Sequence, residues 1–466
     1  MADAVDDAVL PIDDSVPANP VEESATAAST AASGGSGPGG SEPGGGGSSG
    51  TGKDSTLVAV KMAAALPAFW ESLTPAKNVV FLSPQFPSWV TKFAVALGKH
   101  KNVNVLGIGD DSYEALPADL QGALTEYFRV DSMDDYDAVL RAIGFFTHKY
   151  GKIDRFESLN EHWLELEAQI RADFNIPGPK PEFIELVRHK SLMKSVFERA
   201  GVPYIKGTVT ASLDQALGFA KDAGYPLVVK PDSGSGASFT YRVDDDEALT
   251  EVFARLPAAM LPVVVEQYMN ANTLTYDGIV DGHGVIIFES STRTEQSIMD
   301  VVNEGGNAHY VCLPDMPPEV RKVGAAIVKA YRLRERFFHI EIFERRDGRG
   351  LVGLEINLRP PGAWLTDAMN VSHSTDVYAR WAAMVAGDPQ PESGPGRYYS
   401  AYASRKNFNK YAHTNSECED YLGHRLVYFA PIEKILQAAM GDEAYLTRDD
   451  TYEQAMGDIE YIQERA

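Results

Sequence analysis

The stretch FFHIEIFERRDGRGLVGLEINLRPPG, at residues 337–362, restricts the fold of this chain more than any other feature. It consists of two apolar, strand-forming runs on either side of a short polar segment that contains Asp347 and Gly348. An Asp-Gly dipeptide between such runs favours a tight turn joining two antiparallel strands. If the hairpin is symmetric about Gly348, Glu341 lies directly opposite Glu355. The sequence therefore predicts a β-hairpin with two facing carboxylates.

The same hairpin predicts a metal site, because side chains alternate along a strand and Glu355, Asn357 and Arg359 share one face. Two carboxylates opposite each other normally destabilise a strand pair, and a divalent cation between them reverses this effect. Glutamate and asparagine oxygens suit Mg²⁺, with Mn²⁺ as an alternative metal. Arg359 could clamp an anionic group with two hydrogen bonds. We expect Glu341, Glu355 and Asn357 to bind the metal; a solvated charged face with Arg359 paired to a glutamate is the alternative.

A second segment, YPLVVKPDSGSGASF at residues 225–239, has the character of an anion-binding loop. A short apolar strand ends at Lys230, and glycine-rich backbone follows. A lysine beside such backbone can hold phosphate groups, because glycine lets N–H groups approach an anion closely. A strand followed by an ordinary surface turn is the alternative. The residues that we assign to this loop are Ser233, Gly234, Ser235 and Gly236.

Two further segments resemble parts of a nucleotide site. The run VVVEQYM begins at Val263, and such a strand can pair its backbone with a purine base while apolar side chains cover the ring. The residues concerned are Glu266, Gln267, Tyr268 and Met269. Lys190, at the start of a helical pattern, is a candidate second lysine for the nucleotide. A core strand that ends at solvent and a solvated helix lysine are the respective alternatives.

Composition excludes several classes of function. The chain has 466 residues and a formal net charge of −24, with no run of basic residues, so nucleic acid is not an expected partner. Cys312 and Cys418 are its only cysteines, too few for a disulfide framework. The N-terminus carries acids where a signal peptide needs positive charge, and no apolar run reaches the length of a membrane span. We expect a cytoplasmic protein without membrane contact.

Composition also divides the chain. Residues 1–54 are rich in glycine, serine, alanine and acids, and cannot bury enough surface to offset the entropy of ordering. From residue 78 onward, strands alternate with helices, which indicates α/β and α+β domains. Prolines near residue 180 and the segment QPESGPG at 390–396 mark boundaries. The expected parts are a disordered tail (1–54), an α/β domain (55–180), two further domains (181–262 and 263–390) and a small C-terminal domain (391–466).

Several individual elements are predicted within these parts. Apolar runs predict strands, and helical spacing between polar or turn residues predicts helices. The strands are expected at Asn78–Ser83, Asn102–Ile108 and Lys152–Ser158. The helices are expected at Trp89–Leu97, His162–Phe174, Ile184–Arg199 and Tyr452–Arg465.

Taken in order, Lys190, Lys230 with its glycine loop, Glu266–Met269, and the Glu341/Glu355/Asn357/Arg359 set resemble the ATP-grasp superfamily, and within it the carboxylate–amine ligases. The resemblance covers roughly residues 78–387. It implies a pre-ATP-grasp α/β domain (55–180) and two lobes (181–262 and 263–390) that grip ATP. It also implies that Lys190 and Lys230 contact the nucleotide and that Arg359 stabilises an acyl phosphate. Where many relatives have an acidic ribose contact, this chain has Thr273, with Asp277 nearby.

The resemblance implies an ADP-forming ligase that activates a small-molecule carboxylate and joins it to an amine, of an amino acid or a peptide. Lys230 and Arg359 are then the residues in contact with the reacting groups, and ATP and Mg²⁺ are the cofactors. The alternatives are a carboxylase or thiol ligase of the same superfamily, a non-catalytic ATP-binding regulatory protein, and an interaction scaffold that uses the acidic tail. The sequence names neither substrate and leaves the homo-oligomeric state open.

Overall fold

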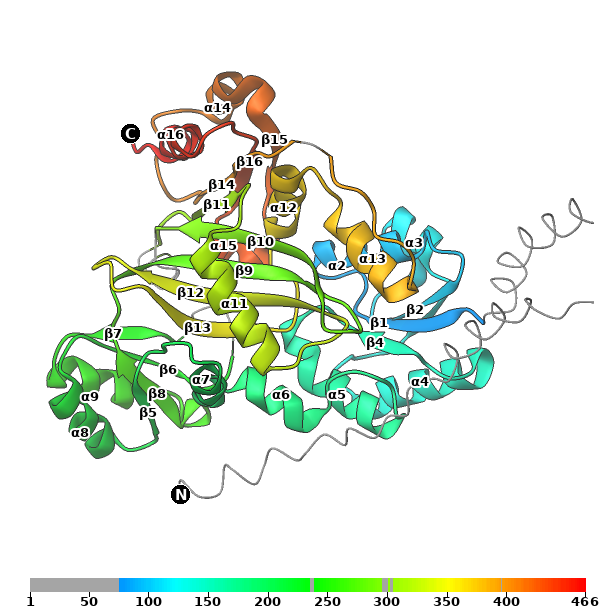
Figure 1. The fold of residues 1–466 in the computed structure, drawn as a ribbon, viewed down its shortest axis with the longest axis horizontal. Helices are drawn as coiled ribbons and strands as arrows, with labels where there is room; N and C mark the ends of the chain where they lie inside the picture. Colours follow the sequence, from blue (N-terminus) through cyan, green and yellow to red (C-terminus); the bar gives the residue numbers. More distant parts are fainter. Residues whose placement is uncertain (1–74, 235–238, 296–300, 302–304, 395) are drawn as a thin grey trace, which may run out of the picture. The chain divides into compact units, whose positions relative to one another are not determined.

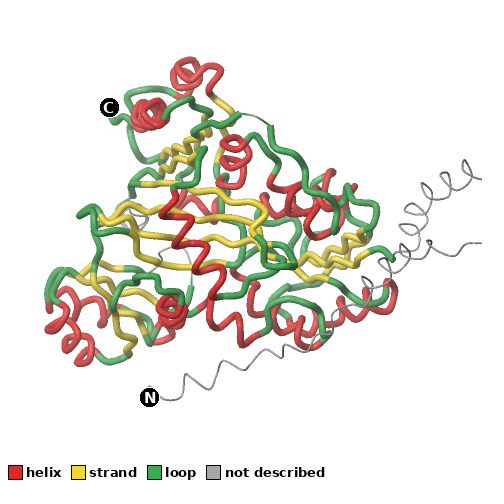
Figure 2. Tube along the Cα trace, viewed as in Figure 1, coloured by secondary structure: helices red, strands yellow, loops and turns green. Residues whose placement is uncertain are grey.

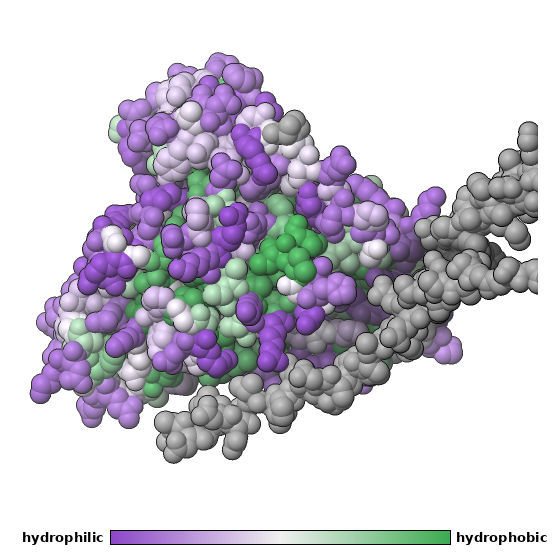
Figure 3. All heavy atoms as spheres, in the orientation of Figure 1, coloured by the Kyte–Doolittle hydropathy of each residue, from purple (hydrophilic) through white to green (hydrophobic). Residues whose placement is uncertain are grey.

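The computed structural model describes residues 75–234, 239–295, 301, 305–394 and 396–466, and the strands within these ranges form three β-sheets (Figure 1). The tail at residues 1–54 lies outside the described residues. Within the described ranges, no helix is both long and apolar enough to cross a membrane. On the face drawn in Figure 3, hydrophilic residues dominate the periphery, and hydrophobic residues gather nearer the middle, over the large sheet.

The first sheet is parallel, with strand order β3-β2-β1-β4. Its central strands are apolar because helices cover both faces, and Val79–Leu82 is completely buried. The predicted strands and helices of this region are present, together with a strand, β3, and two helices, α3 and α4, that were not predicted. The strands are β1 (Lys77–Leu82), β2 (Val103–Gly109), β3 (Glu126–Arg129) and β4 (Arg155–Glu157). The helices are α2 (Ser88–Leu97), α3 (Ala118–Ala123), α4 (Tyr136–Tyr150) and α5 (Leu164–Asp173), with 3-10 turns at Tyr113–Ala115 and Glu161–Trp163.

The helix predicted over Ile184–Arg199 is wrong as a single element. The structure has two helices there, α6 (Pro181–Arg188) and α7 (Lys190–Arg199), separated at His189, whose backbone is extended (φ −95°, ψ 113°). The break has a tertiary cause, because the chain here is bonded to Asp232, 43 residues further along. Its consequence is that Lys190 opens a new helix.

The second sheet is antiparallel, with order β5-β8-β6-β7, and two helices pack on it. Valines of β6 and β8 form its core with small residues of α8, such as Ala216 and Ala220. The strands are β5 (Gly207–Thr210), β6 (Leu227–Pro231), β7 (Tyr241–Val243) and β8 (Val263–Gln267). The helices are α8 (Leu213–Ala223) and α9 (Asp246–Arg255), with a 3-10 turn at Ala258–Met260.

The third sheet has eight strands in the order β13-β12-β9-β10-β11-β14-β16-β15. The helix α11 (Pro318–Ala330) lies across it, as the long helix over the strands in Figure 2 shows. Gly324 of α11 lets the helix approach closely, because a Cβ there would lie 2.1 Å from the ring of Tyr276. The strands in this central region are β9 (Ala271–Val280), β10 (Ile286–Thr294), β11 (His309–Leu313), β12 (Arg336–Arg345) and β13 (Leu351–Asn357). On the opposite face, α12 (Leu365–His373) and α13 (Val377–Ala386) join the core of α2.

The C-terminal strands belong to the same large sheet. β14 pairs with β11, and β16 pairs with β14 and β15, so these residues have no separate sheet. The division of the chain at residues 54, 180, 262 and 390 stays a prediction. The remaining elements are β14 (Ser400–Arg405), β15 (Leu426–Pro431), β16 (Glu443–Thr447), α14 (Asn415–Leu422), α15 (Gln437–Met440) and α16 (Tyr452–Gln463), with 3-10 turns at Gly423–Arg425 and Lys434–Leu436.

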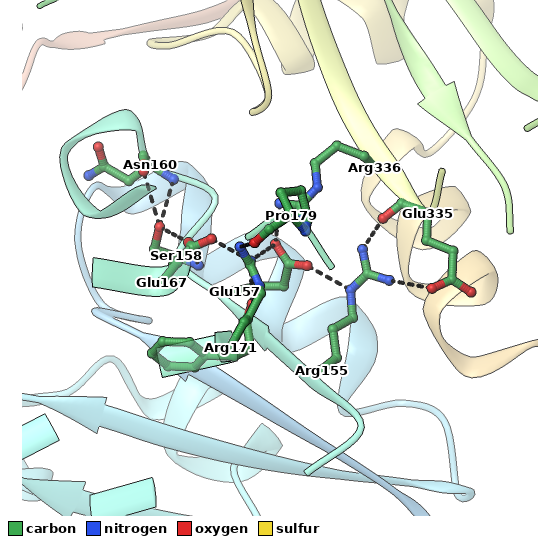
Figure 4. Close-up of polar contacts among 10 residues, drawn as sticks. Arg155, Glu157, Ser158, Asn160, Glu167, Arg171, Pro179, Glu335 and Arg336 are labelled. Atoms are coloured by element: carbon green, nitrogen blue, oxygen red, sulfur yellow. Dashed lines mark hydrogen bonds and ion pairs between the residues drawn. The ribbon is translucent and has the colours of Figure 1, made fainter. Parts of the chain in front are cut away.

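A buried cluster of charged residues joins the first sheet to the large sheet (Figure 4). Glu157 of β4 is bonded to Arg336 of β12 at 2.9 Å and to Arg155 at 2.8 Å. Arg171 of α5 lies 3.6 Å from the same carboxylate and pairs with Glu167. Buried charges are costly unless paired and hydrogen-bonded, and here each carboxylate has an arginine partner. The cluster therefore holds the start of β12 against the end of β4.

Candidate active site

Lys190 is positioned by the polar contacts of Asp232, which directly follows β6. Asp232 Oδ1 accepts from the Ser191 backbone N–H at 2.8 Å, and Oδ2 accepts from the Ser191 hydroxyl at 2.8 Å and from His189 Nδ1 at 3.1 Å. The Lys190 backbone N–H donates to the Asp232 carbonyl at 2.8 Å. The first turn of α7 is thus tied to the end of a strand in the second sheet. Lys190 Nζ donates to the Gly234 carbonyl at 2.7 Å.

Lys230 and a lysine that the sequence analysis missed, Lys194, hold a buried glutamate between them. Glu266 of β8 accepts from Lys194 Nζ at 2.6 Å and pairs with Lys230 through its other oxygen. Burial raises the pKa of a carboxyl, but the two ammonium groups outweigh this effect, and the pKa of Glu266 is lowered. Lys194 lies four residues after Lys190 on the same helix, so the two side chains share one helix face. This spacing could have predicted Lys194 from the sequence.

The hairpin register is confirmed where it concerns the site. Glu341 lies opposite Glu355, and His339 opposite Asn357. Between Glu341 and Ile342 the register shifts by a β-bulge, so the symmetry about the turn does not extend along the whole hairpin. The bulged strand, β13, also forms a backbone hydrogen bond with a segment outside the large sheet.

The bulge lies where another part of the chain meets β13. The Gly353 backbone N–H donates to the Pro203 carbonyl at 2.8 Å, and Tyr204 forms an isolated bridge with Gly353. A Cβ at Gly353 would come within 3.1 Å of the Phe197 ring of α7. The segment that leads into the second sheet is thus attached to β13, next to Glu355.

Glu355 is held by positive charge and by a hydrogen bond. Lys190 Nζ lies 3.6 Å from Glu355 Oε2, and Asn357 Nδ2 donates to Glu355 Oε1 at 3.0 Å. Burial raises the pKa of this carboxyl, but Lys190 and the Asn357 bond, with Lys230 and Arg359, outweigh it, so the pKa of Glu355 is lowered. The positive surroundings therefore favour the charged carboxylate, and its predicted role as a metal ligand stays a prediction. Lys190 is the shared element, because it contacts both the glycine loop and this strand.

Asp277 and His339 extend the polar face of the hairpin into the middle of the sheet. Asp277 of β9 is completely buried and accepts from the Thr275 hydroxyl and from His339 Nδ1, the latter at 2.6 Å. His339 Nε2 lies 3.4 Å from Glu341 Oε1. Burial lowers the pKa of a histidine, but Asp277 outweighs it and raises the pKa of His339 to about 9. Both oxygens of Asp277 are thus engaged with protein groups, and its predicted nucleotide contact stays a prediction.

Arg359 is paired with Glu161, a residue of the 3-10 turn after β4 that the sequence analysis missed. Its Nε and a terminal nitrogen lie 3.2 and 2.8 Å from Glu161 Oε2. Glu161 follows Asn160, whose carbonyl accepts from the Ser158 hydroxyl, and Ser158 is in turn bonded to Glu167 of the buried charged cluster (Figure 4). The cluster therefore fixes the turn that carries Glu161. No sequence signal connects Glu161 to Arg359, because 198 residues separate them.

The other predicted nucleotide contacts lie around the second sheet. Gln267 is exposed and donates to the Ala223 carbonyl at 3.2 Å, and the Tyr268 ring faces the Arg242 guanidinium at 4.5 Å. Met269 follows directly, partly buried. Of the glycine loop, Ser233 and Gly234 are described, while Ser235 and Gly236 lie outside the described residues.

The donor set fits a cation that is shared with a phosphorylated substrate. Among the described residues, no group of three or more His, Cys, Asp or Glu side chains is arranged to hold a metal ion. If they bind Mg²⁺ as predicted, Glu341, Glu355 and the Asn357 amide oxygen would supply only part of its six ligands, and Mg²⁺ sites commonly take the rest from phosphate and water. Lys190 compensates the charge of Glu355 without a metal.

Residues 189–295 match the family model "Carbamoyl-phosphate synthase L chain, ATP binding domain". The L-arginine-specific L-amino acid ligase of Bacillus subtilis is 21% identical over 244 residues, which cover 51% of this chain and 58% of that protein. The matched parts span between 12% and 58% of the lengths of the first curated relatives, less than two thirds of each.

Solved structures match over most of the chain. The L-amino acid ligase from Bacillus licheniformis has a TM-score of 0.62 and 17% identity, covering 83% of this chain and 96% of that one. The biotin carboxylase domain of the Hydrogenobacter thermophilus 2-oxoglutarate carboxylase, in complex with MgADP, has a TM-score of 0.59 and 16% identity, covering 82% and 88%. The chain therefore has the ATP-grasp fold of these solved structures, and residues 189–295 within it match an ATP-binding family model.

Proposed function

We propose that the chain is an ADP-forming ligase that activates a carboxylate with ATP and joins it to an amine. The observation that carries the proposal is the convergence of Lys190, Glu355 and Arg359. Lys190 joins the glycine loop to the carboxylate face of the hairpin, and Arg359, two residues beyond the end of β13, acts on the Glu355 carboxylate and pairs with Glu161. The similarity to two L-amino acid ligases supports the same class of reaction.

In this proposal ATP lies between the second and third sheets. Lys190 and Lys230 contact its phosphates. Glu266 pairs with Lys194 and Lys230 and so orients Lys230. Glu266–Met269 border the adenine, and Ser233–Gly236 cover the phosphates. Glu341, Glu355 and Asn357 hold Mg²⁺, which supplies charge neutralisation on the phosphate oxygens when bound.

The chemistry needs no protein nucleophile. A carboxylate oxygen attacks the γ-phosphorus of ATP, the bond to the β-phosphate oxygen breaks, and ADP leaves. The amine nitrogen then attacks the acyl carbon of the acyl phosphate, the carbon–oxygen bond breaks, inorganic phosphate leaves and the nitrogen loses a proton. The protein contributes positioning and charge, and Lys230 and Arg359 are the groups proposed to contact the transferred phosphoryl group.

Glu161 and Arg359 favour an amino acid as one substrate. In the protein alone the two side chains satisfy each other at 2.8 Å. An amino acid carries one ammonium and one carboxylate group, and the pair offers an oppositely charged partner for each. Bidentate recognition of a carboxylate is a function for which the planar guanidinium of arginine is suited.

A carboxylase is the second candidate, because a biotin carboxylase domain matches 82% of the chain. In that reaction bicarbonate would be the activated carboxylate. The two candidate reactions use the same nucleotide site and differ in the molecule that accepts the activated carboxylate.

The test measures ADP release by the full chain with ATP, Mg²⁺ and pooled amino acids, with bicarbonate as a separate arm and mass spectrometry of the products. The proposal expects ADP and phosphate only when a carboxylate and an amine are both present, with an amide as product. ADP that requires bicarbonate supports the carboxylase. Release of AMP and pyrophosphate contradicts both candidates.

A further inference from the structure

A cavity of about 360 Å³ lies beside the first half of β10, and none of its lining residues belongs to the predicted nucleotide and metal site. Strand β11 pairs with β10 only at Ser291–Arg293, so among the described strands residues 286–290 have no partner on that side. The lining side chains that matter here are Phe288, Glu289, Arg321, His373, Arg380 and Arg397. The cavity thus forms at a sheet edge, between α11 on one face and α12, α13 and the segment after residue 392 on the other.

The cavity has more positive than negative charge. Arg321 is neutralised by Glu289, with nitrogen–oxygen distances of 2.7 and 2.6 Å. Among the described residues, Arg380 and Arg397 have no carboxylate within ion-pair distance. With His373 neutral, the lining carries three arginines against one glutamate.

The two unneutralised arginines are held in place by neutral groups. Arg380 donates to the Thr375 hydroxyl at 2.8 Å and to the Ser393 hydroxyl at 2.7 Å. Arg397 donates to His373 Nδ1 at 2.9 Å. A guanidinium has five N–H groups, so each arginine keeps donors for a further acceptor. Hydrogen bonds to neutral groups therefore fix the two guanidinium groups, and their positive charges are not neutralised by a carboxylate among the described residues.

His373 is fixed as a neutral acceptor for Arg397. Because Nδ1 accepts the guanidinium hydrogen, Nε2 carries the ring hydrogen and donates to the Ser290 hydroxyl at 2.9 Å. The imidazole packs edge-on against Phe288 at 5.6 Å between ring centroids. Burial, with Arg397 next, lowers the pKa of His373 to about 4, in agreement with this arrangement.

We propose that this cavity is a second ligand site, which binds a small molecule carrying oxyanion groups, either phosphate or carboxylate. The volume lies in the range of small-molecule sites, and arginine is the side chain that recognises both groups with paired hydrogen bonds. Ile287 and Phe288 provide an apolar wall beside the arginines. The proposal goes beyond the proposed ligase activity and does not depend on it.

The test titrates the full chain with inorganic phosphate and, separately, with citrate by calorimetry, at constant ionic strength and pH 7.5. A saturating non-hydrolysable ATP analogue with Mg²⁺ is present, so that the lysines at the glycine loop are not free to bind the probe. Wild-type protein is compared with the double variant Arg380→Met/Arg397→Met. The matched control is Arg255→Met, which removes an exposed arginine of α9 that pairs with Glu251.

We expect at least one anion to bind wild type and Arg255→Met equally, and the double variant at least tenfold more weakly. Phosphate alone indicates a phosphorylated ligand, and citrate alone a polycarboxylate. Absence of binding by wild type, or equal binding by the double variant, overturns the proposal. If the double variant does not fold, Arg397→Lys and Arg380→Gln replace it singly, with the same expected loss and the same contrary outcome.

Discussion

Glu341 and Glu355 lie directly opposite each other on β12 and β13, and Lys190 of α7 reaches within 3.6 Å of Glu355. Facing carboxylates repel each other, and here Lys190 and Asn357 offset that repulsion at Glu355. The same arrangement offers two charged oxygens to a cation. Two facing carboxylates on a sheet otherwise rich in apolar residues therefore indicate a functional role.

Glu355→Gln should abolish turnover without damaging the fold. The substitution removes one carboxylate ligand and the repulsion with Glu341, so we expect a loss of about a hundredfold or more in ADP release. The free energy of unfolding should stay the same or fall slightly, because Lys190 loses its counter-charge while the fold otherwise keeps its contacts. Thermal shifts with the Mg²⁺ complex of an ATP analogue should also shrink, which gives a readout independent of turnover.

The matched control for that variant is Glu344→Gln. Glu344 also lies on the hairpin, in β12, but it is not one of the predicted ligands, and its carboxylate pairs with Arg293 at a nitrogen–oxygen distance of 2.7 Å. Turnover in this control should remain near wild type. If Glu355→Gln keeps full activity, the metal assignment fails.

Glu266→Ala should destabilise the protein. Glu266 is buried between Lys194 and Lys230, and its removal leaves two ammonium groups close together without a counter-charge. Breaking a buried ion pair by removing one partner typically costs about 3–5 kcal/mol. Urea unfolding measures this loss, and the neighbouring exposed change Gln267→Ala should alter the unfolding free energy by less than about 0.5 kcal/mol. A loss as small for Glu266 as for Gln267 would count against the ion-pair account.

His373 should make stability depend on pH below its ordinary pKa of 6.5. Because its pKa in the folded protein is about 4, the unfolded chain binds more protons between these values. The contribution is present above pH 6.5 and is lost as pH falls towards 4. The charged groups that act on it are Arg397, Asp315, Glu289 and Arg380.

The comparison for this prediction is His373→Gln, whose amide can accept from Arg397 and donate to Ser290. Between pH 7 and 4, wild type should lose about 3 kcal/mol more unfolding free energy than the variant, measured by urea titration. Asp449, whose pKa is raised to about 7, acts in the opposite direction, but it is common to both proteins and cancels in the difference. Parallel curves would show that His373 does not contribute.

Glu157→Gln should be more harmful than Glu167→Gln. Burial raises the pKa of both carboxyls, but three arginines outweigh it at Glu157, where the pKa is lowered, while burial dominates at Glu167, where the pKa is raised. A neutral amide therefore replaces Glu167 at lower cost. We expect about 3–5 kcal/mol for Glu157→Gln, and clearly less for Glu167→Gln, in urea unfolding. The reverse order would contradict the central role of Glu157.

The hairpin was predictable because its determinants are local. An Asp-Gly turn and the two-residue period of strands are enough to place Glu341 opposite Glu355. The bulge was not predictable, since the Gly353 N–H bonds to Pro203, 150 residues earlier. Likewise, helical periodicity continues through His189, and only the distant Asp232 breaks the helix there.

The parts of the site that were missed all depend on long-range contacts, with one exception. Lys194 could have been inferred from its spacing to Lys190. Glu161 reaches Arg359 through a turn fixed by buried charges, and no local pattern marks it. The arginines of the β10 cavity come from segments far apart in the chain, and only the fold brings them together.

The extension of the large sheet by β14 also limits how the chain can be shortened. Ending the protein at residue 390 would uncover the β11 edge that β14 now occupies, and would leave Tyr310 without Tyr402, on which it stacks at 4.6 Å. An open strand edge with an exposed aromatic ring is a template for pairing between molecules. Such a truncated protein should aggregate when expressed, as light scattering would detect, although every residue of the predicted nucleotide site is retained.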